Sequence, residues 1–133
     1  MLVATSLDLV TGEVSTLAGG AGVGSDDGVG GAARFDGPGG LALDEAAGVL
    51  YVADTFNSTI RAIELDTATV TTVAGAAGVS GSVDGPVASA RLTDPQGVAL
   101  VDRALVFGGF DGSVRALDLD AQTVATVARG LGG

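Results

Sequence analysis

One stretch of 25 residues occurs twice in this chain, and this repetition constrains the fold more than any other feature. The sequence "YVADTFNSTIRAIELDTATVTTVAG", residues 51–75, aligns without a gap with "LVFGGFDGSVRALDLDAQTVATVAR", residues 105–129. The end of this unit is also found near the start of the chain. Its three copies, "VSTLAG", "VTTVAG" and "VATVAR", begin at Val14, Val70 and Val124. The sequence therefore predicts several copies of one structural unit.

Each complete copy contains four short runs of strand-forming residues. In the first complete copy the runs are "GLALD", "GVLYVADT", "STIRAIELD" and "TVTTVAG". In the third run, Ile63 and Leu65 alternate with acidic residues, which is the period of two expected of a half-buried strand. Polar turns such as "DTAT" are short enough to join antiparallel neighbours. Four short antiparallel strands, repeated after a long loop, indicate a β-propeller blade.

The composition also favours an all-β fold. Of the 133 residues, 23 are Gly and 47% are apolar, and the apolar residues form short runs between Gly and Asp clusters. Gly and Pro interrupt every window that is long enough for a helix. We therefore expect an all-β protein of short strands and tight turns.

The charge and the missing residue types exclude several kinds of partner. The formal net charge is −10, and the six cations are all Arg, because the chain has no Lys. An acidic surface repels nucleic acids and anionic lipids, so we expect no nucleic-acid partner. The first residues, "MLVATSLDLVTGE", lack a basic segment, and Asp8 interrupts their apolar run. We therefore expect neither a signal peptide nor membrane insertion.

Motifs in the first complete copy follow a known repeat pattern. A Pro-x-Gly enters the first strand, "YVADTFN" forms the second, "IRAI" the third and "VTTVAG" the fourth. This segment resembles the NHL repeat, in the long-loop form typical of bacterial proteins. The second copy departs from the pattern, with Gly108 in the place of Asp54 and Asp111 in the place of Asn57. The matching residues are Pro38, Gly40, Asp44, Tyr51 to Thr55, Asn57, Ile60, Arg61 and Ile63.

The resemblance implies an NHL-type β-propeller, which in this family is a closed ring of about six blades. The chain accounts for about two and a half four-stranded blades of such a ring. We expect the ring to be completed either by a longer protein or by oligomerisation. The predicted units are a half-blade at 1–18, a loop plus blade at 19–74, a loop plus blade at 75–128, and a tail at 129–133.

Four aspartates are candidates for oxygen ligands of a divalent metal ion. Calcium favours clustered carboxylates, but the loop "GSDDGVGG" lacks the ligand spacing of a calcium loop, and the chain contains no His. The same loop matches a dinucleotide fingerprint only loosely, because Pro38 follows where a helix would be required. We therefore predict no metal and no cofactor. The metal candidates are Asp26, Asp27, Asp44 and Asp54.

The spacing of charged residues in the two long loops predicts structural ion pairs. An Asp and an Arg lie seven residues apart in each loop. A carboxylate and a guanidinium form strong paired hydrogen bonds, so we expect each pair to hold its loop closed. The expected pairs are Asp27–Arg34 and Asp84–Arg91.

Four further polar residues are also interpreted as structural. Arg61 and Arg115 occupy equivalent positions in the two copies, and a residue dictated by a repeat usually serves the repeated unit. Asp54 and Asn57 lie between the second and third strands, where we expect their side chains to satisfy backbone amides.

The sequence predicts a non-enzymatic propeller module that acts as a scaffold for a protein, peptide or other ligand. Its partners include copies of itself, or the rest of a larger propeller. No Cys, His or Lys is present to serve as or activate a nucleophile, so we expect no enzyme. The alternative is a fragment of a lyase- or lactonase-like propeller with a divalent metal on its axis. The resemblance to bacterial NHL proteins implies an extracytoplasmic or secreted setting.

Overall fold

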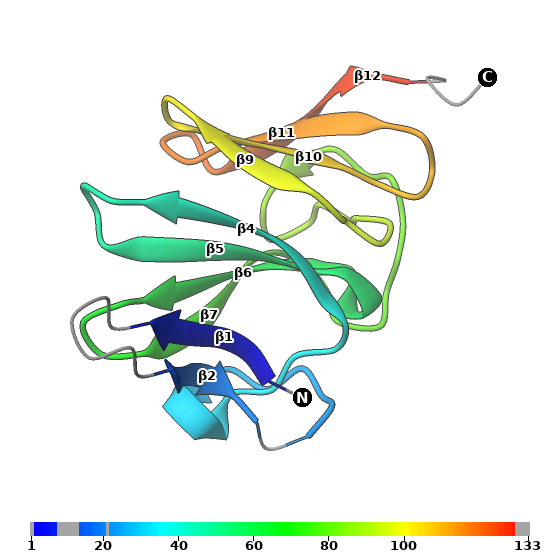
Figure 1. Cartoon of the computed structure of the whole chain (residues 1–133). Helices are drawn as coiled ribbons and strands as arrows, with labels where there is room; N and C mark the ends of the chain where they lie inside the picture. Colours follow the sequence, from blue (N-terminus) through cyan, green and yellow to red (C-terminus); the bar gives the residue numbers. More distant parts are fainter. Residues whose placement is uncertain (1, 8–13, 21, 130–133) are drawn as a thin grey trace.

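The computed structural model describes residues 2–7, 14–20 and 22–129, which form three antiparallel sheets in succession along the chain (Figure 1). Two single turns of 3-10 helix, η1 (Gly30–Ala32) and η2 (Thr55–Asn57), interrupt the loops. No helix in the described part of the chain has the length and hydrophobicity needed to cross a bilayer.

The three sheets are a half-blade and two complete blades of the same topology. The half-blade consists of β1 (Leu2–Leu7) and β2 (Val14–Gly19). The first blade has the strand order β3-β7-β6-β5-β4, and the second has the order β8-β12-β11-β10-β9. The first blade contains β3 (Gly28–Val29), β4 (Pro38–Asp44), β5 (Val49–Asp54), β6 (Thr59–Glu64) and β7 (Thr69–Gly75). The second contains β8 (Gly85–Pro86), β9 (Val98–Val101), β10 (Ala104–Gly108), β11 (Val114–Asp118) and β12 (Thr123–Ala128).

The four expected strands are present in each complete blade, and the structure adds a fifth. The long loop before each blade returns along its outer edge, where β3 pairs with β7 and β8 pairs with β12. The added strands contain only two residues each. They cover part of an edge that would otherwise expose unpaired backbone groups.

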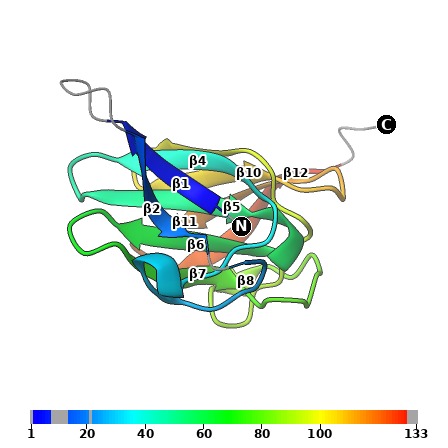
Figure 2. The same ribbon diagram turned by 60° about the horizontal axis from the view of Figure 1, so that its bottom comes forward.

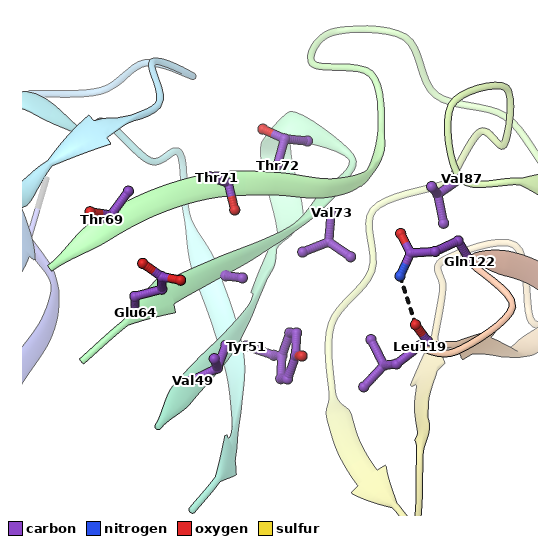
Figure 3. A pocket seen from close by; sticks show the side chains of 11 residues that line it. Val49, Tyr51, Glu64, Thr69, Thr71, Thr72, Val73, Val87, Leu119 and Gln122 are labelled. Carbon is purple, nitrogen blue, oxygen red and sulfur yellow. Dashed lines mark hydrogen bonds between the residues drawn. The ribbon is translucent and has the colours of Figure 1, made fainter. Parts of the chain in front are cut away.

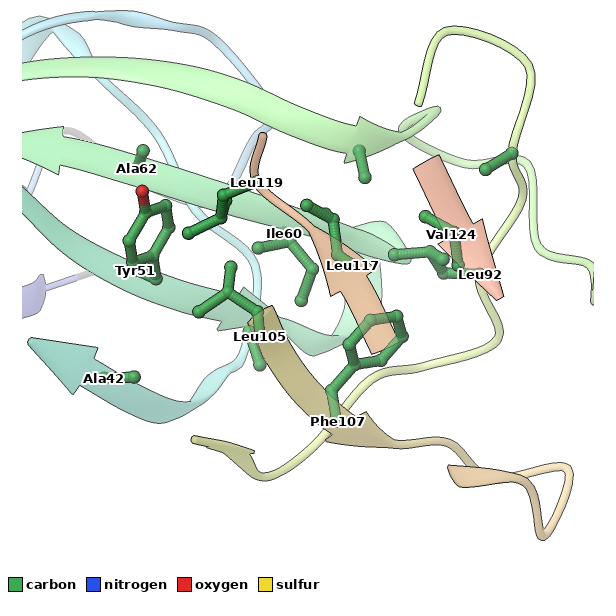
Figure 4. Packing of buried hydrophobic residues seen from close by; sticks show 13 residues of the cluster. Ala42, Tyr51, Ile60, Ala62, Leu92, Leu105, Phe107, Leu117, Leu119 and Val124 are labelled. Carbon is green, nitrogen blue, oxygen red and sulfur yellow. The ribbon is translucent and has the colours of Figure 1, made fainter. Parts of the chain in front are cut away.

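We call the face of a sheet that points in the direction of the next sheet along the chain its front face, and the opposite one its back face. The front face of the first blade packs against the back face of the second. Successive side chains of a strand point to opposite faces, so every second residue joins this interface (Figure 4). The buried front residues are Ala42, Tyr51, Ala53, Ile60, Ala62 and Ala74. The buried back residues of the second blade are Leu105, Phe107, Leu117, Leu119 and Val124.

The half-blade lies over the back face of the first blade (Figure 2). Leu17 and Ala18 of β2 pack against the alternate set of side chains on β5, β6 and β7. The buried residues of that set are Val52, Ile63 and Val70. The whole molecule is thus a stack of sheets in which the front of one meets the back of the next.

Each interface is completed by the long loop that connects the sheets. Ala33 and Phe35 from the first long loop are fully buried behind the first blade. Ala90 and Leu92 occupy the corresponding place behind the second blade and are also fully buried. The short motif "ARF" or "ARL" therefore places two apolar side chains between sheets, with the Arg between them.

Gly40, which matches the NHL pattern, lies at a close contact between the inner strand β4 and the start of β9. Its amide donates a hydrogen bond to the Gln96 carbonyl oxygen at 2.8 Å. A Cβ atom at Gly40 would lie 2.8 Å from both that oxygen and the Val98 nitrogen. A side chain at this position would force the two blades apart, which explains the need for glycine.

The backbone pairing corrects the ungapped alignment of the two copies. Arg61 pairs with Val52, whereas the equivalent Arg115 pairs with Phe107. Phe107 therefore takes the place of Val52, although the alignment without gaps sets it against Ala53. The turn between the second and third strands is one residue shorter in the second blade. Since a shift of one residue exchanges the two faces of a strand, the pairing determines which side chains are buried.

Candidate functional site

Arg61 lies at the centre of a buried polar network in the first blade. Its side chain is 1% exposed, and one of its terminal nitrogens, Nη1, donates hydrogen bonds to the Asp54 carboxylate at 2.8 Å and the Arg34 carbonyl oxygen at 2.9 Å. The other, Nη2, donates to the Asp27 carboxylate and the Asp26 carbonyl oxygen, both at 2.9 Å. One guanidinium thus connects strand β6 to the preceding long loop.

Asp54 is the fully buried member of this network. Its carboxylate accepts hydrogen bonds from the Asp36 amide at 2.8 Å and the Asn57 Nδ2 at 2.7 Å, in addition to that from Arg61. Burial raises the pKa of Asp54, and the hydrogen bonds from Asn57, Asp36 and Arg61 offset this only in part. Asn57 Nδ2 also donates to the Gly24 carbonyl oxygen at 2.7 Å. The backbone amide that Asp54 satisfies therefore belongs to the long loop, whereas we expected one in its own turn.

Arg115 forms the corresponding network in the second blade with one carboxylate fewer. Its Nε and Nη2 donate to Asp84 at 3.2 Å and 2.8 Å, while Nη1 and Nη2 donate to the carbonyl oxygens of Arg91 and Val83. Gly109 takes the place of Asp54, because its amide pairs with the Ser113 carbonyl across the shorter turn. This corrects the assignment of Gly108 to that place.

Asp84 is anchored by the outer strand as well as by Arg115. Thr126 donates to it from both its amide and its hydroxyl group. Burial acts to raise the pKa of Asp84, but the hydrogen bonds from Arg115 and Thr126 outweigh this effect and lower the pKa.

The expected pairing of Asp27 with Arg34 and of Asp84 with Arg91 is wrong. Asp27 pairs with Arg61, and Arg34 pairs with Asp26 at 3.5 Å. Nη1 of Arg91 donates to the Ala90 carbonyl oxygen. Among the residues that the structure describes, Asp84 forms an ion pair with Arg115 and none with Arg91. The backbone carbonyl oxygen of Arg34 instead accepts a hydrogen bond from Arg61, and that of Arg91 accepts one from Arg115. A spacing of seven residues in a loop did not reveal which way each side chain points.

Asp44 belongs to a separate contact between the two blades. Its carboxylate accepts the Ala47 amide at 3.1 Å and lies 3.4 Å from Nη1 of Arg103 in the turn between β9 and β10. Arg103 also pairs with Asp120 at 3.2 Å. Burial and the charge of Asp44 together raise the pKa of nearby Tyr51, and Arg103 opposes them.

The four metal candidates are distributed over these three contacts and do not converge. Asp27 and Asp54 share one guanidinium, Asp26 pairs with Arg34, and Asp44 with Arg103. Within the residues that the structure places, no three acidic, His or Cys side chains could together hold a metal ion. The described part of the chain therefore does not bring the four candidates together as one metal site.

A pocket of about 460 Å³ lies between the two blades (Figure 3). Its floor is the front face of β5, β6 and β7, and its opposite wall comes from the turn after β11 and the loop after β8. The pocket could not be found from the sequence, because its two walls come from different blades. The lining residues are Val49, Tyr51, Ala62, Glu64, Thr69, Thr71, Thr72, Val73, Val87, Leu119 and Gln122.

Two exposed aromatic side chains were also missed, although the repeat contained the signal. Phe56 and Phe110 are 63% and 65% exposed. Each lies between the second and third strands of its blade, and each amide donates to the preceding long loop, at Asp36 and Thr93 respectively. The repeat therefore presents an aromatic ring at the same place on each blade.

Comparison with known proteins identifies the repeat. No family model matches the chain. Over 105 residues the chain is 30% identical to NHL repeat-containing protein 2 of Bos taurus, a match that covers 77% of this chain and 14% of that protein. The chain belongs to the NHL-repeat family. The NHL chain is also 34% identical over 110 residues to the chloroplastic protein SUPPRESSOR OF QUENCHING 1 of Arabidopsis thaliana, with 77% of this chain and 10% of that protein covered.

Solved structures share the fold of this NHL chain. A protein of unknown function from Bacteroides thetaiotaomicron superposes with a TM-score of 0.67 at 23% identity, covering 92% of this chain and 29% of that one. An auxiliary nutrient binding protein from Bacteroides ovatus gives a TM-score of 0.64 at 23% identity, covering 93% and 32%. The NHL chain thus spans less than a third of these structures and about a seventh or less of the two curated relatives.

Proposed function

We propose that this NHL chain is a non-enzymatic interaction module whose apolar blade faces bind further propeller strands. In the isolated chain, a second copy supplies these strands. One observation carries the proposal. Leu41 and Leu43 on the back face of β4 are 48% and 50% exposed, whereas their counterparts Val98 and Leu100 on β9 pack against the first blade. The first blade therefore presents apolar side chains where the second blade has a neighbour.

The front face of the second blade supports the same conclusion. Val127 is 64% exposed, while its counterpart Val73 packs into the interface between the blades. Val101, at the end of the inner strand, is 55% exposed on the same face. A propeller sheet is stabilised by neighbours on both faces, so these side chains favour a further blade as the partner.

The ion pairs of the candidate carboxylates favour binding over catalysis. Arg61 holds Asp27 and Asp54 as structural counter-ions, and the remaining candidates also lie beside arginines. Carboxylate oxygens that already accept hydrogen bonds from a guanidinium have fewer lone pairs left for a metal ion or a substrate. A relative in fold that is named a nutrient binding protein agrees with a binding role.

The test is the molar mass in solution, measured by light scattering over a range of protein concentrations. We expect the wild-type chain to associate, and we expect Leu43→Asp or Val127→Asp to shift it toward the monomer, because each places a charge on an apolar contact face. Val29→Asp is the matched control, since Val29 is 59% exposed on the outer edge strand β3. A wild-type chain that stays monomeric at every concentration would disprove self-association.

A further inference from the structure

We propose that the pocket between the two blades binds a primary ammonium group that carries a short aliphatic chain. The pocket lies within one chain, so this proposal is independent of self-association. Its volume of about 460 Å³ is within the range of small-molecule sites.

The register of the first blade builds the floor of the pocket. Glu64 pairs with Val49 on one side and Thr69 on the other, forming one row across the sheet. Two residues further along, Ala62 forms a second row between Tyr51 and Thr71. Because positions two apart share a face, both rows point to the front. The small side chain of Ala62 leaves space between its two larger neighbours.

The second blade closes the pocket with mainly apolar groups. Leu119 and Gln122 come from the turn between β11 and β12, and Val87 comes from the loop after β8 (Figure 3). With Val49 and Val73 they provide aliphatic walls on which methylene groups could pack. The pocket therefore combines aliphatic walls with Glu64 on one side and Gln122 on the opposite side (Figure 3).

The charge of the lining selects a cation. Glu64 is the one charged side chain among the lining residues, and no Arg is among them. The formal net charge of the whole chain is −10, which raises the local concentration of cations. An anionic ligand would meet no positive side chain among the lining residues, although Arg103 acts on Tyr51 from outside the lining. An ammonium group would gain a charge-assisted hydrogen bond to Glu64.

Three other lining residues contribute neutral oxygen atoms to the pocket. The Nε2 of Gln122 donates to the Leu119 carbonyl oxygen at 2.8 Å, so the amide presents its oxygen as the remaining acceptor. The hydroxyl of Thr71 lines the floor beside Glu64. Tyr51, whose pKa is raised by burial, keeps a neutral hydroxyl that can also accept a hydrogen bond. An ammonium group has three donors, for which Glu64 and Thr71 are the acceptors of the first blade, while Gln122 lies on the opposite side of the pocket (Figure 3).

The ammonium group can come from a free amine or from a lysine side chain. Titration calorimetry of the 133-residue chain with pentylamine and with Nα-acetyl-lysine amide distinguishes these sources. The neutral analogues pentanol and Nα-acetyl-norleucine amide test the charge. We expect each ammonium compound to bind at least about fivefold more tightly than its neutral analogue, with the difference decreasing as salt is added. Tighter binding of pentylamine would identify free amines, and tighter binding of the lysine compound would identify a peptide or protein ligand.

Two variants and one control locate the binding. Glu64→Gln keeps the shape of the lining and should weaken pentylamine binding about fivefold. Glu45→Gln removes the same charge from an exposed turn outside the pocket and should leave binding unchanged. Thr71→Phe places a ring in the pocket from an exposed position and should abolish binding.

Three results would overturn the proposal. The first is equal affinity for pentylamine and pentanol. The second is an equal loss in Glu64→Gln and Glu45→Gln, which would reduce the effect to net charge. The third is the absence of any binding to the wild-type chain.

Discussion

The two blades attach their preceding long loops with different numbers of charged side chains. Arg61 and Arg115 are 1% and 2% exposed at equivalent positions, and both hold the preceding long loop through two carbonyl oxygens and an acidic side chain. Only the network of Arg61 includes a second, fully buried carboxylate, that of Asp54. The difference teaches that loop attachment needs one arginine and one half-exposed carboxylate. The first blade also buries the Asp54 carboxylate, so its stability depends more strongly on its arginine.

The hydrogen bonds of the two arginine Nε atoms also differ between the blades. Nε of Arg115 donates to Asp84, whereas Nε of Arg61 is buried without a hydrogen-bond partner among the described residues. The guanidinium of Arg61 instead lies 4.6 Å from the centre of the Phe35 ring, a cation–π contact. Leu92 occupies the place of Phe35 in the second blade and offers no such contact. The first network is therefore more deeply buried and less completely hydrogen-bonded.

The largest expected effect comes from removing the two arginines. Arg61→Ala should lower the free energy of unfolding by about 3–5 kcal/mol, because it leaves Asp54 charged, buried and without its cation. Arg115→Ala should lower it by about 1–3 kcal/mol, because Asp84 is 38% exposed and can be hydrated. Urea unfolding of both variants measures the difference. Equal losses of unfolding free energy in the two variants would show that Asp54 does not make the first blade more dependent on its arginine.

The pH dependence of stability should separate the two carboxylates, with a smaller effect. The pKa of Asp84 is lowered by folding, so its contribution is present above the ordinary value of 3.8 and is lost as the pH falls through its folded pKa. The pKa of Asp54 is raised, so its contribution is present below 3.8 and is lost as the pH rises through its folded pKa.

Replacing each carboxylate should therefore change the acid response in opposite directions. Asp84→Asn should flatten the loss of stability on acidification, and Asp54→Asn should make it steeper. Urea unfolding between about pH 3 and pH 6 gives both slopes. A change of the same sign in both variants would contradict the assignment of opposite shifts.

The smallest effect is expected for the charge pairs of Arg103, which contrast with both buried networks. Arg103 is 53% exposed and contacts Asp44 and Asp120 at 3.4 Å and 3.2 Å. Exposed pairs contribute little, because water and salt screen them. Arg103→Gln should leave the melting temperature close to that of the wild type. A loss comparable to that of Arg115→Ala would show that this contact holds the blades together.

The repeat allowed the sheets to be predicted, because period-two patterns and turn residues are local properties of the sequence. It also identified Arg61 and Arg115 as equivalent structural residues. The position of Phe107 was not predictable from the ungapped repeat, since a turn that is one residue shorter leaves the similarity of neighbouring residues almost unchanged. Which carboxylate reaches which arginine depends on the path of the loop in space. The spacing of residues along the chain does not contain that information.

The pocket illustrates a second limit of reasoning along the chain. Tyr51, Ala62 and Thr71 could be placed in one row once the strands were aligned. Their partners Leu119 and Gln122 come from the next blade, and no local pattern relates them to that row. A site made by two copies of a repeat becomes visible only when the copies are stacked.

The front-to-back packing of the sheets gives the molecule a polarity. When a contact joins two unlike surfaces, each added unit covers one surface and exposes another of the same kind. Association can therefore continue. The rotation from one sheet to the next then decides the outcome. A rotation that brings the last unit back to the first produces a ring, and any other rotation produces a growing filament. Substitutions that tilt one blade against the next, such as a side chain at Gly40, should therefore change the size of an assembly more than its affinity.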